Sequence, residues 1–220
     1  MLRAAGVGVG DEVVVPAFGN VEVAEAVALA GALPVFADID PVSYCLDASA
    51  VEAALTPRTV AVVVVHRFGR PADLGPLHAV GGRHGLLVLE HGESEAPYDE
   101  IAQRRQRAAY LDGKLKGVRT PDWGDGHTYQ QYVVRVPGNG RPDRDAFARA
   151  VRLRGVGCWV PVKTPVHRMP GFRRCVALPE TERAADETLA LPVDAALTKR
   201  DMQRIVSACN ALGGLLQPAL

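Results

Sequence analysis

Short apolar runs, rich in β-branched residues, recur along the first half of the chain and predict strands. They are Glu12–Pro16, Leu33–Ala37, Val60–His66 and Leu86–Glu90. The stretches between them carry apolar residues at helical spacing, and predict helices at Val21–Ala30, at Ala48–Leu55 and over about residues 72–82. Strands that alternate with helices predict a parallel sheet with right-handed crossovers. We expect an α/β layer with strands in the spatial order second, first, third, fourth.

Local signals mark the ends of these helices. Asn20 and Asp47 stand where an N-cap side chain accepts a backbone N–H, and Gly31 stands where a left-handed residue ends a helix. Gly81 and Gly82 predict the end of the third helix.

The fourth apolar run, Leu86–Glu90, has a composition typical of a central strand, yet the predicted strand order places it at an edge. An uncovered apolar edge invites pairing with another chain. We therefore expect a partner to cover it, most simply another copy.

The second half has a different texture, and predicts an α+β domain with a small antiparallel sheet. A long helix is expected at Tyr98–Lys116, and Asp143 is expected to cap another at Arg144–Arg154. Strands are expected at Thr128–Val136 and Val156–Val162. The final helices are predicted at Thr181–Leu189 and Thr198–Leu212, the latter with a capping-box pattern formed by Thr198 and Asp201. We expect two domains, residues 1–97 and 98–220.

Composition narrows the class of protein. Apolar residues make up 48% and charged residues 23% of the 220 residues, which is typical of a globular protein, and the net charge is zero. A neutral chain gives no reason to expect a nucleic-acid partner, and neutrality favours self-association. No apolar run reaches membrane-spanning length, and the first residues lack the features of a signal peptide. We expect a cytoplasmic protein with no membrane partner.

The cysteines give no sign of a metal site. Cys45, Cys158, Cys175 and Cys209 are scattered, without a C-x-x-C pair or a histidine at metal-binding spacing. Reduced thiols are the favoured interpretation, and no metal ligands are assigned.

A collinear set of phrases covers most of the chain. In the first half they are Gly8–Phe18, Ala24–Val27, Pro34–Pro41, Leu55–Thr59 and Val65–Asp73. In the second half they are His127–Arg135, Pro165–Phe172 and Leu189–Pro192. Together they resemble the DegT/StrS sugar aminotransferases, pyridoxal phosphate (PLP) enzymes of the aspartate aminotransferase (type I) fold. The resemblance implies a cut-down type I fold and a dimer, with nucleotide-sugar transamination as the activity of the family.

The resemblance also implies four features that hold PLP, and none of them is matched here. The Schiff-base lysine belongs on a segment after the fourth strand, but Ala96 and Pro97 run directly into the helix that begins at Tyr98. The carboxylate that pairs with the pyridine nitrogen is matched by His91, and the aromatic residue that stacks on the ring is matched by Asn20. The phosphate-binding helix terminus would precede residue 1. The chain's lysines lie elsewhere, at Lys114, Lys116, Lys163 and Lys199.

Two classes of function follow. In the first, the chain is a degenerate family member, a pseudoenzyme with no catalytic residues and no PLP, which acts as a binding or structural subunit. Its partner would be a second copy or a full-length paralogue. In the second, the chain is catalytic, either as half of a split aminotransferase with the lysine on another chain, or through a PLP-independent site.

The candidate for such a site is a crevice at the carboxyl ends of the third and fourth strands. His66 and His91 end neighbouring strands, which lie about 4.8 Å apart in a sheet, and Glu93 and Glu95 follow. This grouping predicts a divalent-metal or acid–base site, with ordinary polar residues at a strand exit as the alternative. His167 lies in a Pro-rich stretch that resembles a family segment near the substrate, with a hydrogen-bonded loop histidine as the favoured alternative.

Overall fold

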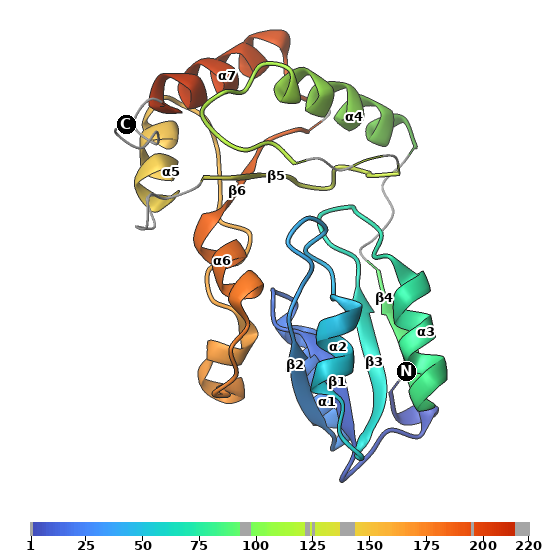
Figure 1. Ribbon diagram of the computed structural model, residues 1–220. Coiled ribbons are helices and arrows are strands. Elements are labelled where there is room, and N and C mark those ends of the chain that lie inside the picture. Colours follow the sequence, from blue (N-terminus) through green and yellow to red (C-terminus); the bar gives the residue numbers. More distant parts are fainter. Residues whose placement is uncertain are drawn as a thin grey trace. The chain divides into compact units, whose positions relative to one another are not determined.

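The structure is a computed structural model that describes residues 2–92, 98–121, 124, 126–136, 144–194 and 196–213. The chain forms two compact units (Figure 1). The parallel-sheet unit comprises Met1–Arg67, Pro71–Glu93 and Thr164–Arg183, and the antiparallel unit comprises Phe68–Arg70, Ser94–Lys163 and Ala184–Leu220. The expected domain boundary after residue 97 adjoins residues 93–97, which lie outside the described part.

The parallel-sheet unit confirms the predicted strands and their order. Its strands are β1 (Glu12–Pro16), β2 (Leu33–Ala37), β3 (Thr59–Val65) and β4 (Leu87–His91). All neighbours pair in parallel, in the order β2-β1-β3-β4. The first two strands match the predicted bounds, whereas β3 begins one residue earlier and β4 one residue later than predicted. Six of the seven residues of β3 are buried, as expected for a strand that is covered on both faces.

Helices cover the two faces of this sheet. They are α1 (Val21–Ala30), α2 (Ala48–Ala54) and α3 (Leu74–His84), with a short 3₁₀ turn, η1 (Arg3–Ala5), before β1. Val23 and Val27 of α1 pack with Val13 and Val15 on one face. On the other face, α2 and α3 pack against the alternate residues of the strands; this cluster includes Val14, Val51, Val62, Val64, Leu77 and Val80. Successive side chains of a strand point to opposite faces, so alternate residues of the same strands belong to two different apolar cores.

The predicted end of the third helix at Gly81 and Gly82 is wrong, because α3 continues to His84 and ends at Gly85 with a left-handed φ of +67°. Gly81 is needed for packing instead. A Cβ on Gly81 would lie 2.7 Å from Cγ2 of Val88 and 3.2 Å from the carbonyl oxygen of Leu86. The glycine therefore allows α3 to approach β4 closely.

A segment from late in the chain completes the parallel-sheet unit. It contains the 3₁₀ turns η2 (Val166–Arg168) and η3 (Pro170–Phe172) and the beginning of α6 (Pro179–Glu187). The backbone N–H of Val166 donates to the carbonyl oxygen of Ala17 at 2.8 Å. The Asp38 carboxylate accepts the N–H groups of Glu180 at 3.0 Å and Thr181 at 2.8 Å, and so caps α6.

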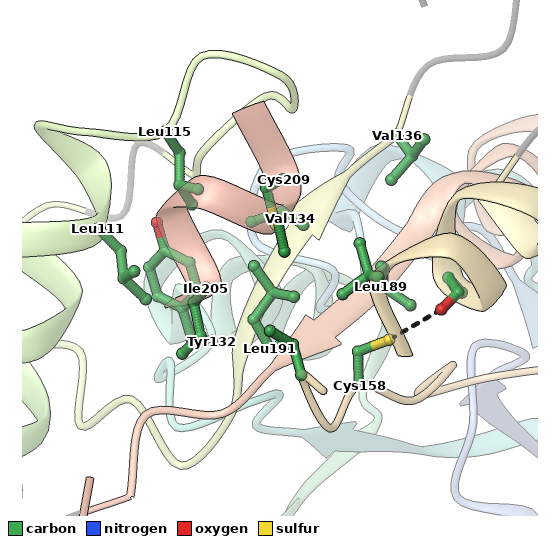
Figure 2. Close-up of a cluster of buried hydrophobic side chains, with 14 of the residues drawn as sticks. Leu111, Leu115, Tyr132, Val134, Val136, Cys158, Leu189, Leu191, Ile205 and Cys209 are labelled. Atoms are coloured by element: carbon green, nitrogen blue, oxygen red, sulfur yellow. Dashed lines mark hydrogen bonds between the residues drawn. The ribbon is translucent and has the colours of Figure 1, made fainter. Parts of the chain in front are cut away.

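The antiparallel unit contains α4 (Tyr98–Asp112), β5 (Tyr132–Arg135), α5 (Arg144–Leu153), β6 (Thr188–Leu191) and α7 (Lys199–Gly213). Strands β5 and β6 pair antiparallel, with Tyr132 opposite Leu191 and Arg135 opposite Thr188. Figure 2 shows the core between the sheet and its helices, where Leu111, Tyr132, Leu189, Leu191 and Ile205 are fully buried or nearly so. The predicted antiparallel sheet is confirmed, but one of its strands was placed wrongly.

The prediction of a strand at Val156–Val162 is wrong. There, only Trp159 forms a bridge, which exchanges backbone hydrogen bonds with Ala190. The second strand is β6, and its first two residues fall within the helix predicted at Thr181–Leu189. That helix, α6, ends at Glu187, and the four residues of β6 that follow are all buried.

The strand predicted at Thr128–Val136 starts only at Tyr132, because the preceding residues bind another part of the chain. The N–H of Thr128 donates to the carbonyl oxygen of Gly69 at 2.8 Å, and the N–H of Gln131 donates to that of Phe68 at 3.2 Å. A Cβ on Gly69 would lie 2.3 Å from the Thr128 hydroxyl oxygen, and its φ is +89°. Only glycine permits this approach.

Cap predictions have mixed outcomes. Asp47 accepts the N–H of Ala50 at 2.8 Å, and Thr198 and Asp201 form the predicted reciprocal cap. Gly31 ends α1 with a φ of +94°. Asp143 lies outside the described residues. Among the helices that the structure describes, none has the length and apolar character needed to cross a membrane.

The two adjacent glycines of α3 give a matched test of this packing. Gly81→Ala should lower the free energy of unfolding by about 1–3 kcal/mol, because the new methyl group collides with Val88. Gly82→Ala should raise it by about 0.5–1 kcal/mol, because the helix gains propensity and no heavy atom lies within 4 Å of the new carbon. Urea unfolding of both variants measures the difference, and equal effects would contradict the close packing of α3 on β4.

Candidate functional site

The carboxyl ends of β1, β3 and β4 form the candidate site in the parallel-sheet unit, since ligands of open α/β sheets bind at this edge. The residues that leave these strands include Phe18 and Asn20 after β1, His66 and Arg67 after β3, and His91 at the end of β4. Their contacts decide what chemistry remains possible.

Asn20 is engaged by Arg67. Asn20 stands at the predicted N-cap position of α1 with a left-handed φ of +55°, but the predicted capping hydrogen bond from its side chain is wrong, because the side chain accepts no N–H of the helix. Its Oδ1 accepts a hydrogen bond from Nη1 of Arg67, and its Nδ2 donates to Oε1 of Glu22 at 3.2 Å. Arg67 is only 7% exposed, and its guanidinium carbon lies 5.6 Å from the centroid of the Phe18 ring. The amide thus holds a buried cation in place.

His66 is held by two neighbours. Its Nδ1 accepts the backbone N–H of Ala72 at 3.0 Å, so a neutral imidazole carries its proton on Nε2. Nε2 lies 3.5 Å from Oε2 of Glu90 on β4. Both ring nitrogens therefore face groups of the fold itself, which is typical of a structural histidine.

His91 does not join His66. Glu90 and His91 are consecutive in β4 and project to opposite faces of the sheet, and the side chain of His66 lies beside Glu90. Glu93 and Glu95, the other members of the expected crevice, lie outside the described residues. Among the described residues, no group of three or more histidine, cysteine, aspartate or glutamate side chains is arranged to hold a metal ion.

His167 is 1% exposed, in η2 of the late segment. Its Nε2 lies 3.3 Å from Oε1 of Glu182, whose other oxygen contacts Arg168 at 2.8 Å. Its ring lies 6.4 Å from that of Phe36 on β2. Together with the Asp38 cap, these contacts attach the late segment to the end of β2, so the structure gives His167 a packing role.

A buried histidine that the sequence did not single out lies in the antiparallel unit. His127 is 1% exposed, and its Nδ1 accepts the N–H of Tyr129 at 2.8 Å. The pKa of His127 is lowered to about 3 by burial first, and then by the positive charges of Arg70 and Arg105. A histidine between polar residues carries no sequence signal of burial, so only the resemblance to a family phrase marked this position.

The comparisons with known proteins identify the family. The profile of the DegT/DnrJ/EryC1/StrS aminotransferase family matches residues 1–92 and 98–210. The chain belongs to this family. Its architecture agrees, because the aminotransferase TlmJ from Streptoalloteichus hindustanus superimposes with a TM-score of 0.86 at 26% identity, over 98% of this chain and 83% of that one.

Two relatives contain residues that have no counterpart in this chain. A GDP-perosamine synthase from Caulobacter vibrioides is 32% identical over 201 aligned positions, and the alignment covers 86% of this chain but 50% of that protein. The pleiotropic regulatory protein of Geobacillus stearothermophilus is 28% identical over 299 positions, covering 93% of this chain and 79% of that protein. This alignment is longer than the 220-residue chain, so the relative contains residues without a counterpart here. The family match is interrupted at residues 93–97, directly after β4.

The residues that remain do not fit PLP. The parallel-sheet unit contains no lysine, because Lys114, Lys116, Lys163 and Lys199 all belong to the antiparallel unit. His91 ends β4 where the resemblance implies a carboxylate, and the amide of Asn20 is bound to Arg67. The lysine amine that binds the coenzyme, the carboxylate that pairs with its ring nitrogen and the aromatic residue that stacks on its ring are thus all unmatched in this unit.

The low pKa of His127 predicts a pH dependence of stability. Above pH 6.5 the histidine is neutral in both the folded and the unfolded chain. Between pH 6.5 and about 3 only the unfolded chain takes up the proton, so the free energy of unfolding falls with falling pH by up to about 1.4 kcal/mol per pH unit. His127→Asn should remove this part of the slope in urea unfolding series, whereas His78→Asn, at an exposed position of α3, should leave it unchanged. Identical slopes in wild type and His127→Asn would contradict the assignment.

The attachment of the late segment through Asp38 also has a test. Asp38→Ala should remove the cap of α6 and lower the free energy of unfolding by about 1 kcal/mol, because two backbone N–H groups lose their acceptor. Hydrogen exchange should accelerate first at Glu180 and Thr181. Unchanged exchange there would show that Asp38 does not hold the late segment.

Proposed function

We propose that this family member is a pseudoenzyme, a cytoplasmic subunit that does not form the PLP site by itself and acts by association with another protein chain. One observation carries the proposal: the family match stops directly after β4, where the resemblance implies the lysine-bearing segment, and the parallel-sheet unit has no lysine. The folded parts on both sides of that interruption support a structural role, because each unit has its own apolar core.

The chemistry of the remaining residues supports the same proposal. Both nitrogens of His66 face groups of the fold, and Asn20 neutralises no charge but orients a buried guanidinium. A catalytic acid or base needs a nitrogen or oxygen that can reach a substrate. His66 offers none in this arrangement.

The primary test is PLP binding. Purified protein with equimolar PLP should give no absorbance band of a lysine Schiff base, and borohydride treatment should leave no stoichiometric label on any single lysine. A full-length family enzyme, treated in parallel, supplies the positive signal. A stoichiometric label that maps to one lysine and is lost in the corresponding Lys→Arg variant would overturn the proposal.

A second candidate is half of a split nucleotide-sugar aminotransferase. It is favoured by the two-block family match, which leaves both flanks of the interruption recognisable. In this case another chain would supply the lysine. Transaminase activity that appears only when the chain is mixed with such a partner, with the lysine label on the partner, would establish this candidate in place of the first.

A further inference from the structure

The outer edge of β4 presents backbone groups that point away from the sheet. The N–H of His66 donates to the carbonyl oxygen of His91 at 3.3 Å, so the backbone groups of His91 face β3. Successive residues of a strand direct their N–H and C=O groups to opposite sides. Val88 and Glu90 therefore direct theirs outward, and β4 ends the strand order that the structure describes.

Each face of β4 contacts one of the apolar cores of the parallel-sheet unit through a partly buried residue. Val88 lies against Gly81 of α3, and Leu89 packs on the cluster that contains Val63 and Val65. Among the described residues, no strand pairs with this edge in the plane of the sheet. Another strand has the backbone geometry to pair with such an edge along its length.

We propose that a second copy of the chain pairs with this edge, with the two β4 strands antiparallel and Leu89 opposite Leu89 of the second copy. The inference rests on the proposed function, because it names the partner of the subunit. A two-fold axis through the sheet requires a register in which residues of the same face meet. Centred on Leu89, this register places Val88 opposite Glu90 of the second copy, and these are the residues whose backbone groups point outward.

The neighbouring registers are less favourable. Centring on Glu90 would place two carboxylates directly opposite each other, which is destabilising. Centring on Val88 would place Glu90 opposite Leu86, outside the strand. The register at Leu89 pairs every residue of β4, and the zero net charge of the chain adds no long-range repulsion between copies.

The variant Glu90→Pro tests pairing between copies without removing a hydrogen bond of the chain's own sheet. Its missing N–H is one that points outward, so the ladder with β3 stays intact while pairing between copies loses a donor. Wild type and Glu90→Ala should both have the mass of two chains by light scattering, and Glu90→Pro the mass of one, with unchanged circular dichroism. Glu90→Ala is the matched control, because it removes the same side chain but keeps the N–H.

A cross-link tests the register even if the proline variant fails to fold. In a background with the exposed thiol removed (Cys175→Ser), Leu89→Cys should form a disulfide-linked dimer under mild oxidation, because directly opposed residues lie within disulfide reach. Leu87→Cys should not, although Leu87 is 43% exposed, because it faces His91 of the second copy.

The outcomes separate this inference from the proposed function. A monomeric wild type, a dimer that survives Glu90→Pro, or preferential cross-linking through Leu87→Cys would each overturn the pairing. A monomer that binds only a different chain would overturn it as well. None of these results changes PLP binding, and a PLP adduct on one lysine would overturn the pseudoenzyme proposal without affecting the mass of the dimer.

Discussion

The backbone N–H and C=O groups of an edge strand need hydrogen-bonding partners, and this requirement is the main constraint on β4. The outward N–H and C=O groups of Val88 and Glu90 belong to a strand with three apolar residues in sequence, which sheets normally place in the interior. The strand stays ordered because α3 approaches it through Gly81 on one face and the β1–β3 core supports Leu89 on the other. Within the described part of the chain, β4 is thus supported on its two faces, although Leu87 stays 43% exposed, and no further strand follows it in the sheet.

The chain keeps the architecture of the family on both sides of the interruption in the family match at residues 93–97. The parallel-sheet unit keeps its strand order, and a late segment is still attached through Asp38, Val166 and His167. These contacts use backbone groups and buried side chains, which do not depend on a coenzyme. At the carboxyl edge of the sheet, the side chain of Arg67 contacts the Phe18 ring and donates a hydrogen bond to Asn20.

The sequence predicted the parallel sheet well, because buried parallel strands are continuous apolar runs bounded by turns. Prediction from the sequence was wrong where contacts between residues far apart in the chain determine the local structure. Nothing local at Thr128 reveals its bond to Gly69, and nothing local distinguishes Thr188–Leu191 from the end of a helix until Tyr132 and Trp159 pair with it. At the candidate site, adjacency of strands predicted that His66 and His91 would meet. Side chains alternate between the two faces along β4, so Glu90 rather than His91 lies beside His66. An error of one residue in the predicted bounds of a strand is enough to exchange its two faces.

The two adjacent glycines of α3 show a further limit of prediction from the sequence. From sequence alone, Gly81 and Gly82 are equivalent helix breakers, yet α3 passes through both. The free-energy cost of glycine in a helix, about 1 kcal/mol, is offset at Gly81 by the contact with Val88 that no larger residue allows. Because α3 approaches β4 through this glycine, the position of the edge strand depends in part on a residue that propensity alone would count against the helix. The geometry available for pairing at the edge therefore depends on packing behind it.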